Sequence, residues 1–181
     1  MRIRRVLTYA STVLLVAIAG LTGLSNPAAA AVDDYVFRYY KNTDLVMSVS
    51  GGRFGNGVGD IVWPDRYLPD ASDHAGFQRW EWVARGNGWT TFIGQNEETP
   101  LALAVSGGSL ADGANIIQWQ WNTANLEQQW FVEWHGSYAL VVNRKSGKCM
   151  AVRDGLTTQG TGLVQKSCNV NLTEQRWYLE N

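Results

Sequence analysis

The chain has 181 residues, of which 45% are hydrophobic, with nineteen glycines, four prolines and nine tryptophans. Fifteen Lys and Arg stand against sixteen Asp and Glu, so the formal net charge is −1. A near-neutral chain without a basic run argues against nucleic acid or an anionic membrane surface as a partner.

The first thirty-one residues have the pattern of a secretory signal peptide. Three arginines precede a largely apolar stretch over residues 6–24, and alanines occupy positions 28–31. This order of basic, apolar and small residues predicts export, with cleavage after Ala30 or Ala31. The alternative is an uncleaved membrane anchor, which Pro27 and the alanine run disfavour.

Residues 32–181 are then the predicted mature domain, of about 150 residues, which is an ordinary size for one domain with its own core. The three leader arginines would leave with the leader, so twelve basic residues would face sixteen acidic ones, a net charge of −4. No apolar stretch after Leu24 is long enough to span a bilayer, so we expect no membrane insertion.

A short signature, Gln-x-Trp, recurs three times after the leader. The copies end at Trp80, Trp130 and Trp177, which are 50 and 47 residues apart. A period in this range indicates one repeated supersecondary unit that shares its core with its neighbours. The predicted repeats cover about residues 36–85, 86–135 and 136–181. A glycine follows at the same offset from the second strand of each repeat, as Gly57, Gly113 and Gly160.

Each repeat contains four stretches with strand character, which either alternate in polarity or are rich in β-branched and aromatic residues. They cover 36–40, 45–49, 60–63 and 78–83, then 89–93, 102–105, 115–121 and 128–134, then 138–142, 149–152, 162–168 and 175–179. The first repeat is longer by an insertion between Arg66 and Phe77, which reads as a surface loop. The pattern predicts an all-β domain of about twelve short strands.

Three Gln-x-Trp copies in register resemble the ricin-B-type β-trefoil lectins, over roughly residues 36–181. The resemblance implies a β-trefoil of three four-stranded repeats with pseudo-threefold symmetry. It also implies a binding module for a glycan or polysaccharide. We expect neither a cofactor nor a metal, and no catalytic residue, because His74 and His135 have neither triad nor metal-ligand spacing.

The signature residues are expected to be structural. A large indole from each repeat fills the shared core if its N–H finds an acceptor, and the Gln can bond to nearby backbone. These core residues are Trp80, Trp130, Trp177, Gln78, Gln128 and Gln175. The alternative for the tryptophans is ligand contact.

The two cysteines, Cys149 and Cys168, are expected to form a disulfide after export. The bridge would close a loop of roughly 20 residues, worth about 3 kcal/mol in the chain-entropy model. In the family that the chain resembles, repeats often bridge their second and third strands at these positions. The alternative, a nucleophilic or metal-binding cysteine, lacks a histidine nearby in the sequence.

The resemblance implies one sugar pocket per repeat, built from an Asp, an amide, an aromatic ring and an Asn. These positions hold Ser48, Ile61, Trp63 and Phe77 in the first repeat, Ala104, Ile117, Trp119 and Glu127 in the second, and Ala151, Val164, Lys166 and Glu174 in the third. A hydrogen bond to a charged group contributes about 1.5–3 kcal/mol, whereas a millimolar site has only about 4 kcal/mol in total. The galactose-type pocket is therefore predicted to be inactive in all three repeats.

A different carbohydrate site is predicted around the retained tryptophans, because aromatic faces stack on sugar C–H groups while amides and carboxylates bind hydroxyls. The candidate residues are Trp119, Gln120, Asn122, Asn125 and Glu127 in the second repeat, which is the better candidate, and Trp63, Asp65 and Ser48 in the first. The first-repeat insertion adds Tyr67, Asp70, Asp73 and His74. Strand alternation is expected to place Trp119 and Trp121 on one face. The alternative is that both are half-buried strand residues.

These observations predict a secreted, non-catalytic module that binds carbohydrate. The alternative is a protein-interaction subunit of a secreted complex, because the sugar-pocket residues are missing while exposed tryptophans are retained.

Overall fold

A computed structural model describes residues 33–66, 75–95 and 99–181. The predicted leader lies outside these residues, and so do Tyr67, Asp70, Asp73 and His74 of the insertion. The strands of the described part are β1 (Asp34–Tyr39), β2 (Leu45–Val49), β3 (Asp60–Pro64), β4 (Trp80–Gly86), β5 (Trp89–Gly94), β6 (Leu101–Val105), β7 (Ile116–Gln120), β8 (Trp130–His135), β9 (Tyr138–Asn143), β10 (Cys149–Val152), β11 (Leu163–Lys166) and β12 (Trp177–Glu180). Single-turn 3-10 helices are η1 (Ser50–Gly52), η2 (Ala75–Phe77), η3 (Ser106–Gly108), η4 (Leu126–Gln128), η5 (Arg153–Gly155) and η6 (Thr173–Gln175).

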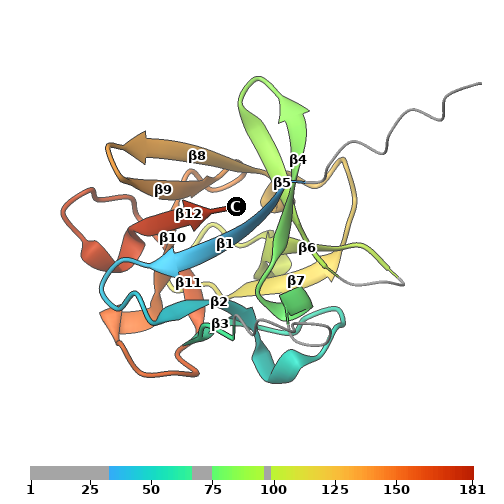
Figure 1. Cartoon of the computed structure of the whole chain (residues 1–181). Helices are drawn as coiled ribbons and strands as arrows, with labels where there is room; N and C mark the ends of the chain where they lie inside the picture. Colours follow the sequence, from blue (N-terminus) through green and yellow to red (C-terminus); the bar gives the residue numbers. More distant parts are fainter. Residues whose placement is uncertain (1–32, 67–74, 96–98) are drawn as a thin grey trace, which may run out of the picture. The chain divides into compact units, whose positions relative to one another are not determined.

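The first and fourth strands of the repeats close into a barrel. The antiparallel pairs β1–β4, β4–β5, β5–β8, β8–β9, β9–β12 and β12–β1 form a complete ring. Within this ring of six described strands no edge is left open, and closure is how small antiparallel barrels avoid edge-to-edge association. The second and third strands form the hairpins β2–β3, β6–β7 and β10–β11, which lie together at the lower end of the barrel in Figure 1. This confirms the β-trefoil fold and its all-β class.

The three hairpins meet through one contact that is repeated around the pseudo-threefold axis. The N–H of Gly57 donates to the carbonyl of Gln118, Gly113 to Gln165, and Gly160 to Val62, each at 2.8 Å. The glycines have φ of 81°, 81° and 83°. This left-handed conformation is strained for any residue with a Cβ, which explains why a glycine recurs at the same offset in each repeat.

The signature tryptophans fill the core at the centre of this arrangement. Trp80, Trp130 and Trp177 are each fully buried. The indole Nε1–H of Trp130 donates to the Leu103 carbonyl at 2.9 Å, and that of Trp177 donates to the Met150 carbonyl at 3.3 Å. The Nε1 of Trp80 has no hydrogen-bond partner among the described residues, so the first repeat departs from the other two at its core.

Each signature Gln clamps the chain where it leaves the third strand. Gln128 donates to the Gln120 carbonyl and accepts from the Asn122 N–H, at 2.9 and 2.8 Å. Gln175 makes the same pair of bonds to Ser167 and Asn169, and Gln78 makes it to Pro64 and Arg66. The expectation that Gln opens the fourth strand is wrong. The strands begin two residues later, at the tryptophans, because the Gln side chain is needed in the preceding turn.

A buried carboxyl group lies at the start of the third strand in the first repeat. Asp60 at the start of β3 is 1% exposed, and neither of its carboxylate oxygens has a hydrogen-bond partner among the described residues. The equivalent residues of the other repeats are Ile116 and Leu163, which lie in the hydrophobic core. Burial raises the pKa of Asp60 well above its usual value.

Cys149 and Cys168 form a disulfide that joins the start of β10 to the segment after β11. Replacing both by alanine is expected to lower the free energy of unfolding by about 3 kcal/mol, because the unfolded chain regains the entropy of an open loop of about 20 residues. Alanine already stands at the Cys149 position in the second repeat, as Ala102. Urea unfolding measures the effect, and reduction of the wild-type protein should reproduce it. Equal stability of the two forms would contradict the prediction.

No helix within the described residues is long and apolar enough to cross a membrane.

Candidate functional site

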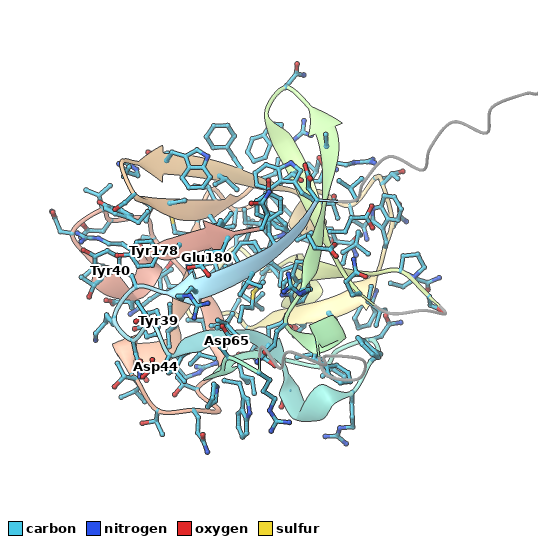
Figure 2. The ribbon with its side chains drawn as sticks, viewed as in Figure 1. Tyr39, Tyr40, Asp44, Asp65, Tyr178 and Glu180 are labelled. Atoms are coloured by element: carbon cyan, nitrogen blue, oxygen red, sulfur yellow. A yellow bond between two sulfur atoms is a disulfide. The ribbon has the colours of Figure 1, made fainter. Side chains whose placement is uncertain are left out.

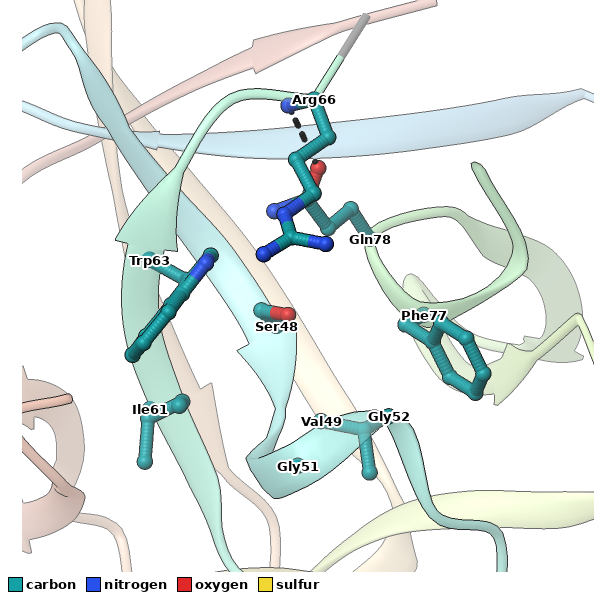
Figure 3. A pocket seen from close by; sticks show the side chains of 9 residues that line it. All are labelled: Ser48, Val49, Gly51, Gly52, Ile61, Trp63, Arg66, Phe77 and Gln78. Carbon is teal, nitrogen blue, oxygen red and sulfur yellow. Dashed lines mark hydrogen bonds between the residues drawn. The ribbon is translucent and has the colours of Figure 1, made fainter. Parts of the chain in front are cut away.

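The first repeat has a cavity of about 300 Å³ on the outer face of the β2–β3 hairpin. The hairpin, the η1 turn and the segment before β4 supply its walls (Figure 3). It is lined by Ser48, Val49, Gly51, Gly52, Ile61, Trp63, Arg66, Phe77 and Gln78. Ser48, Ile61, Trp63 and Phe77 are the four positions at which the sequence resemblance implied a sugar pocket.

Two aromatic rings form opposite walls of this cavity. The half-buried Trp63 lies against the Gly160 turn of the third repeat, where an added Cβ would lie 3.7 Å from the indole. Phe77 stacks on Phe54, with ring centroids 4.7 Å apart and planes 26° apart. Both rings thus have a neighbour on their outer side, and Figure 3 shows them on opposite sides of the cavity. Ile61 lies beside Trp63 and adds apolar surface.

The polar groups of the cavity are few. Ser48 is 5% exposed, and its hydroxyl points between the two rings (Figure 3). Among the described residues this hydroxyl has no hydrogen-bond partner. The Gln78 amide is already used by Pro64 and by the backbone N–H of Arg66, both at 3.0 Å. The Arg66 guanidinium lies 5.9 Å from the centroid of the Trp63 ring.

The equivalent positions of the other repeats hold ion pairs. In the second repeat Lys145 pairs with Glu127 at 3.4 Å, and its ammonium lies directly over the Gly108 turn. In the third repeat Lys166 pairs with Glu174 at 3.6 Å. The Lys41 ammonium there donates to the Gly155 carbonyl. The glutamates replace Phe77, so these two sites are charged and internally paired where the first is apolar.

Of the predicted polar partners of Trp119, Asn122 uses its side chain in a turn, whereas Gln120 and Asn125 make hydrogen bonds there through their backbone. The Gln120 N–H donates to Asn56 Oδ1 at 2.6 Å, and Asn122 Oδ1 accepts from the Ala124 N–H at 2.9 Å. The Asn125 carbonyl accepts from the Gln128 N–H at 3.2 Å. Trp119 itself is 44% exposed and lies against the Gly57 turn. The second-repeat site stays a prediction, with Trp119 as its exposed surface.

Trp121 does not follow the strand alternation used to place it. β7 ends at Gln120, and the Trp121 N–H donates to the Pro100 carbonyl at 3.0 Å. The half-buried Trp121 ring lines a second cavity with Glu81 and Ile93. The alternation rule applies only within a strand, so it does not place Trp121 beside Trp119.

Asp65 points away from the first-repeat cavity. Its carboxylate pairs with Arg38 at 2.7 Å, and Arg38 also contacts Glu180 at 2.8 Å. These two carboxylates, Glu180 more than Asp65, raise the pKa of Arg38. Figure 2 shows Asp65 and Glu180 close to β1, the strand that carries Arg38. Sequence reasoning missed Arg66 and counted Phe77 only as a lost Asn. A sequence signal for Arg66 was present, because Arg66 is the residue whose backbone N–H donates to the signature residue Gln78.

The cavity therefore offers an indole face, a free hydroxyl and a guanidinium. Groups of at least three metal-binding side chains are absent from the described residues.

The chain matches the family model of the ricin-type β-trefoil lectin domain over residues 41–177. The protein belongs to this family. No curated protein matches the chain in sequence.

Solved structures similar to this ricin-type domain include a designed threefold-symmetric protein, ThreeFoil, with a TM-score of 0.73, 24% identity and coverage of 82% of this chain and 98% of that one. The exo-β-1,3-galactanase 1,3Gal43A from Clostridium thermocellum has a TM-score of 0.69 and 26% identity, and the match covers 81% of this chain and 29% of the galactanase. A Polyporus squamosus lectin, bound to Neu5Acα2-6Galβ1-4GlcNAc, has a TM-score of 0.65 and 16% identity, over 83% and 49%. The ricin-type domain thus spans less than a third of the galactanase and about half of the lectin.

Proposed function

We propose that this chain is a secreted, non-catalytic carbohydrate-binding module whose binding site is the first-repeat cavity. The observation that carries this proposal is the cavity of about 300 Å³ against the Trp63 ring. Small-molecule sites begin at about this size, so the cavity suits a single sugar ring. Trp63 offers an apolar face to the ring C–H groups, and the Ser48 hydroxyl is free to bond with a sugar hydroxyl.

Membership in a lectin family supports carbohydrate as the ligand class. The replacement of the family's Asp, amide and Asn by Ser48, Ile61 and Phe77 supports a preference other than the galactose type. The lining residues that belong to the described part of the chain include neither a carboxylate nor a histidine. Glycoside hydrolysis needs a pair of carboxylates around the scissile bond, which supports binding without catalysis. The leader pattern and the Cys149–Cys168 bridge support secretion, because disulfides persist in oxidising compartments.

A glycan array, followed by titration of the intrinsic tryptophan fluorescence with its hits, tests the proposal. Trp63→Ala is expected to weaken binding by roughly 30-fold, about 2 kcal/mol, because a buried aromatic contact dominates small interfaces. Trp119→Ala is the matched control, an equivalent tryptophan that lies outside the cavity, and it should bind as the wild type does. The thermal midpoint of each variant shows that it is folded.

Loss of binding in Trp119→Ala alone would move the site to the second repeat. A silent array would contradict the carbohydrate proposal.

A protein-interaction module is the second candidate function. It is favoured by exposed apolar side chains around the hairpins, of which Leu110 is 61%, Leu156 50% and Trp119 44% exposed. A silent array together with a stoichiometric partner recovered from culture supernatant would establish this alternative.

A further inference from the structure

The charge of the cavity points to a narrower ligand class. We propose that the first-repeat cavity binds one pyranose that carries a carboxylate, with the carboxylate on Arg66. This inference rests on the proposed carbohydrate function. Among the nine lining residues Arg66 is the single charged side chain. A negative ligand group would therefore meet one cation and no competing carboxylate among the described lining residues.

Arg66 is held in place but is not neutralised. Its backbone N–H donates to Gln78 Oε1 at 3.0 Å, so the residue leaves β3 at a fixed point. Its guanidinium lies over Trp63 and has no carboxylate partner among the described residues. A guanidinium binds a planar carboxylate through two parallel hydrogen bonds, and little order is lost when the group is already positioned.

In the other repeats the residues equivalent to Arg66 are Asn122 and Asn169, and the cations near the equivalent sites are lysines from other positions, which have carboxylate partners. Lys145 is paired with Glu127, and Lys166 is paired with Glu174. In the first repeat the equivalent of these glutamates is Phe77, which stacks on Phe54. The anion is thus supplied by the protein in two repeats and is missing from the described residues in the first. A bound ligand can supply it there.

The remaining groups fit the rest of a sugar ring. Ser48 has its unpartnered hydroxyl aimed into the cavity beneath the Arg66 guanidinium (Figure 3). This places a hydroxyl within reach of a ring substituent while the carboxylate lies on Arg66. The Trp63 face takes the C–H side of the ring. Because the equivalent sites of the other repeats hold their own ion pairs, we expect one ligand per chain.

The test compares sugars that differ at a single group. Methyl β-D-glucuronide and methyl β-D-glucoside share a ring and differ only in the carboxylate, and the methyl glycoside of N-acetylneuraminic acid offers a carboxylate from a second sugar class. Fluorescence titration is expected to give at least about tenfold tighter binding for one acidic sugar than for the glucoside, since a charge-assisted hydrogen bond is at stake. Calorimetry of the acid that binds should give a stoichiometry of one. Which of the two acids binds shows whether the carboxylate is that of a glucuronide or that of N-acetylneuraminic acid.

Arg66→Gln should remove this preference and leave acid and neutral sugar with equal affinity. Arg53→Gln is the matched control, because Arg53 is an exposed arginine near the η1 turn that does not line the cavity. It loses the same charge, so it should keep the preference. Ser48→Ala should weaken both sugars alike.

Equal binding of acid and neutral sugar by the wild type would overturn the carboxylate inference and leave the carbohydrate function standing. So would a preference that survives in Arg66→Gln. A wild-type protein that binds none of these sugars and no array glycan would instead contradict the proposed function itself.

Discussion

Replacing Asp60 by leucine is expected to raise the free energy of unfolding at pH 7 by about 3 kcal/mol. The wild-type carboxyl group is fully buried, and neither oxygen has a hydrogen-bond partner among the described residues. Leucine removes this unsatisfied polar group and adds apolar contact. The symmetry of the fold supports the choice, because Ile116 and Leu163 occupy the equivalent positions in the core. Urea or thermal unfolding measures the gain.

The same carboxyl group should make stability depend on pH. Burial raises the pKa of Asp60 above its unfolded value of about 3.9. The folded state therefore holds the proton more tightly than the unfolded state does. The stabilising contribution of protonated Asp60 to the free energy of unfolding is thus fully present below about pH 3.9. It is lost as pH rises towards the raised pKa, at up to about 1.4 kcal/mol per pH unit.

Asp60→Asn separates titration from packing, because the amide stays polar and cannot ionise. The difference in unfolding free energy between wild type and Asp60→Asn, measured against pH, separates the effect of Asp60 titration from that of the other carboxylates. One such carboxylate is Asp112, whose pKa is lowered, chiefly by a hydrogen bond from Lys148, and which acts in the opposite direction. A pH-independent difference, or no gain in Asp60→Leu, would show that the Asp60 carboxyl is compensated.

Replacing Trp130 by alanine is expected to lower the free energy of unfolding by about 4 kcal/mol. The indole is fully buried in the shared core. Its removal leaves a cavity that neighbouring strands of a closed barrel cannot easily fill. It also leaves the Leu103 carbonyl without the hydrogen bond that Trp130 Nε1–H donates at 2.9 Å. Chemical denaturation measures the loss, and a slope m equal to that of the wild type shows that the variant exposes the same surface on unfolding.

Phenylalanine variants test the hydrogen bond apart from the volume. Trp130→Phe removes a made hydrogen bond, whereas Trp80→Phe removes an indole N–H that has no partner among the described residues. Trp130→Phe should therefore cost about 1–2 kcal/mol more than Trp80→Phe. Equal losses would mean that both indoles are bonded alike in solution.

Much of the fold followed from local patterns. Gln-x-Trp at a regular interval identified the repeat, and the predicted strands correspond to those of the barrel and the hairpins. The ends of the strands were less accurate, as at Gln78, Gln128 and Gln175. Each of these side chains bonds to backbone eight or more residues earlier in the chain. Their role in a turn depends on that backbone, which periodicity does not describe.

The site was harder to predict. Trp63 and Ser48 were named from the repeat alignment, and the structure brings both to one cavity with Arg66. Asp65 was grouped with them because it is near in sequence, yet its carboxylate pairs with Arg38 on β1. In the second repeat, Glu127 was expected to face a ligand, and it pairs with Lys145 from the β9–β10 connection. Each of these partners comes from a distant part of the chain.

The sequence by itself determined the family, the β-trefoil class and the burial of its repeated tryptophans. The reason is that the spacing of the Gln-x-Trp signature and the polarity pattern are local properties, which recur in each repeat. The tertiary structure decided which charges are paired and which are free. Arg38 meets Glu180 across 142 residues, while Arg66 lies over Trp63 without a carboxylate among the described residues. Pairing depends on through-space distance between segments that only the closed barrel and its hairpins bring together.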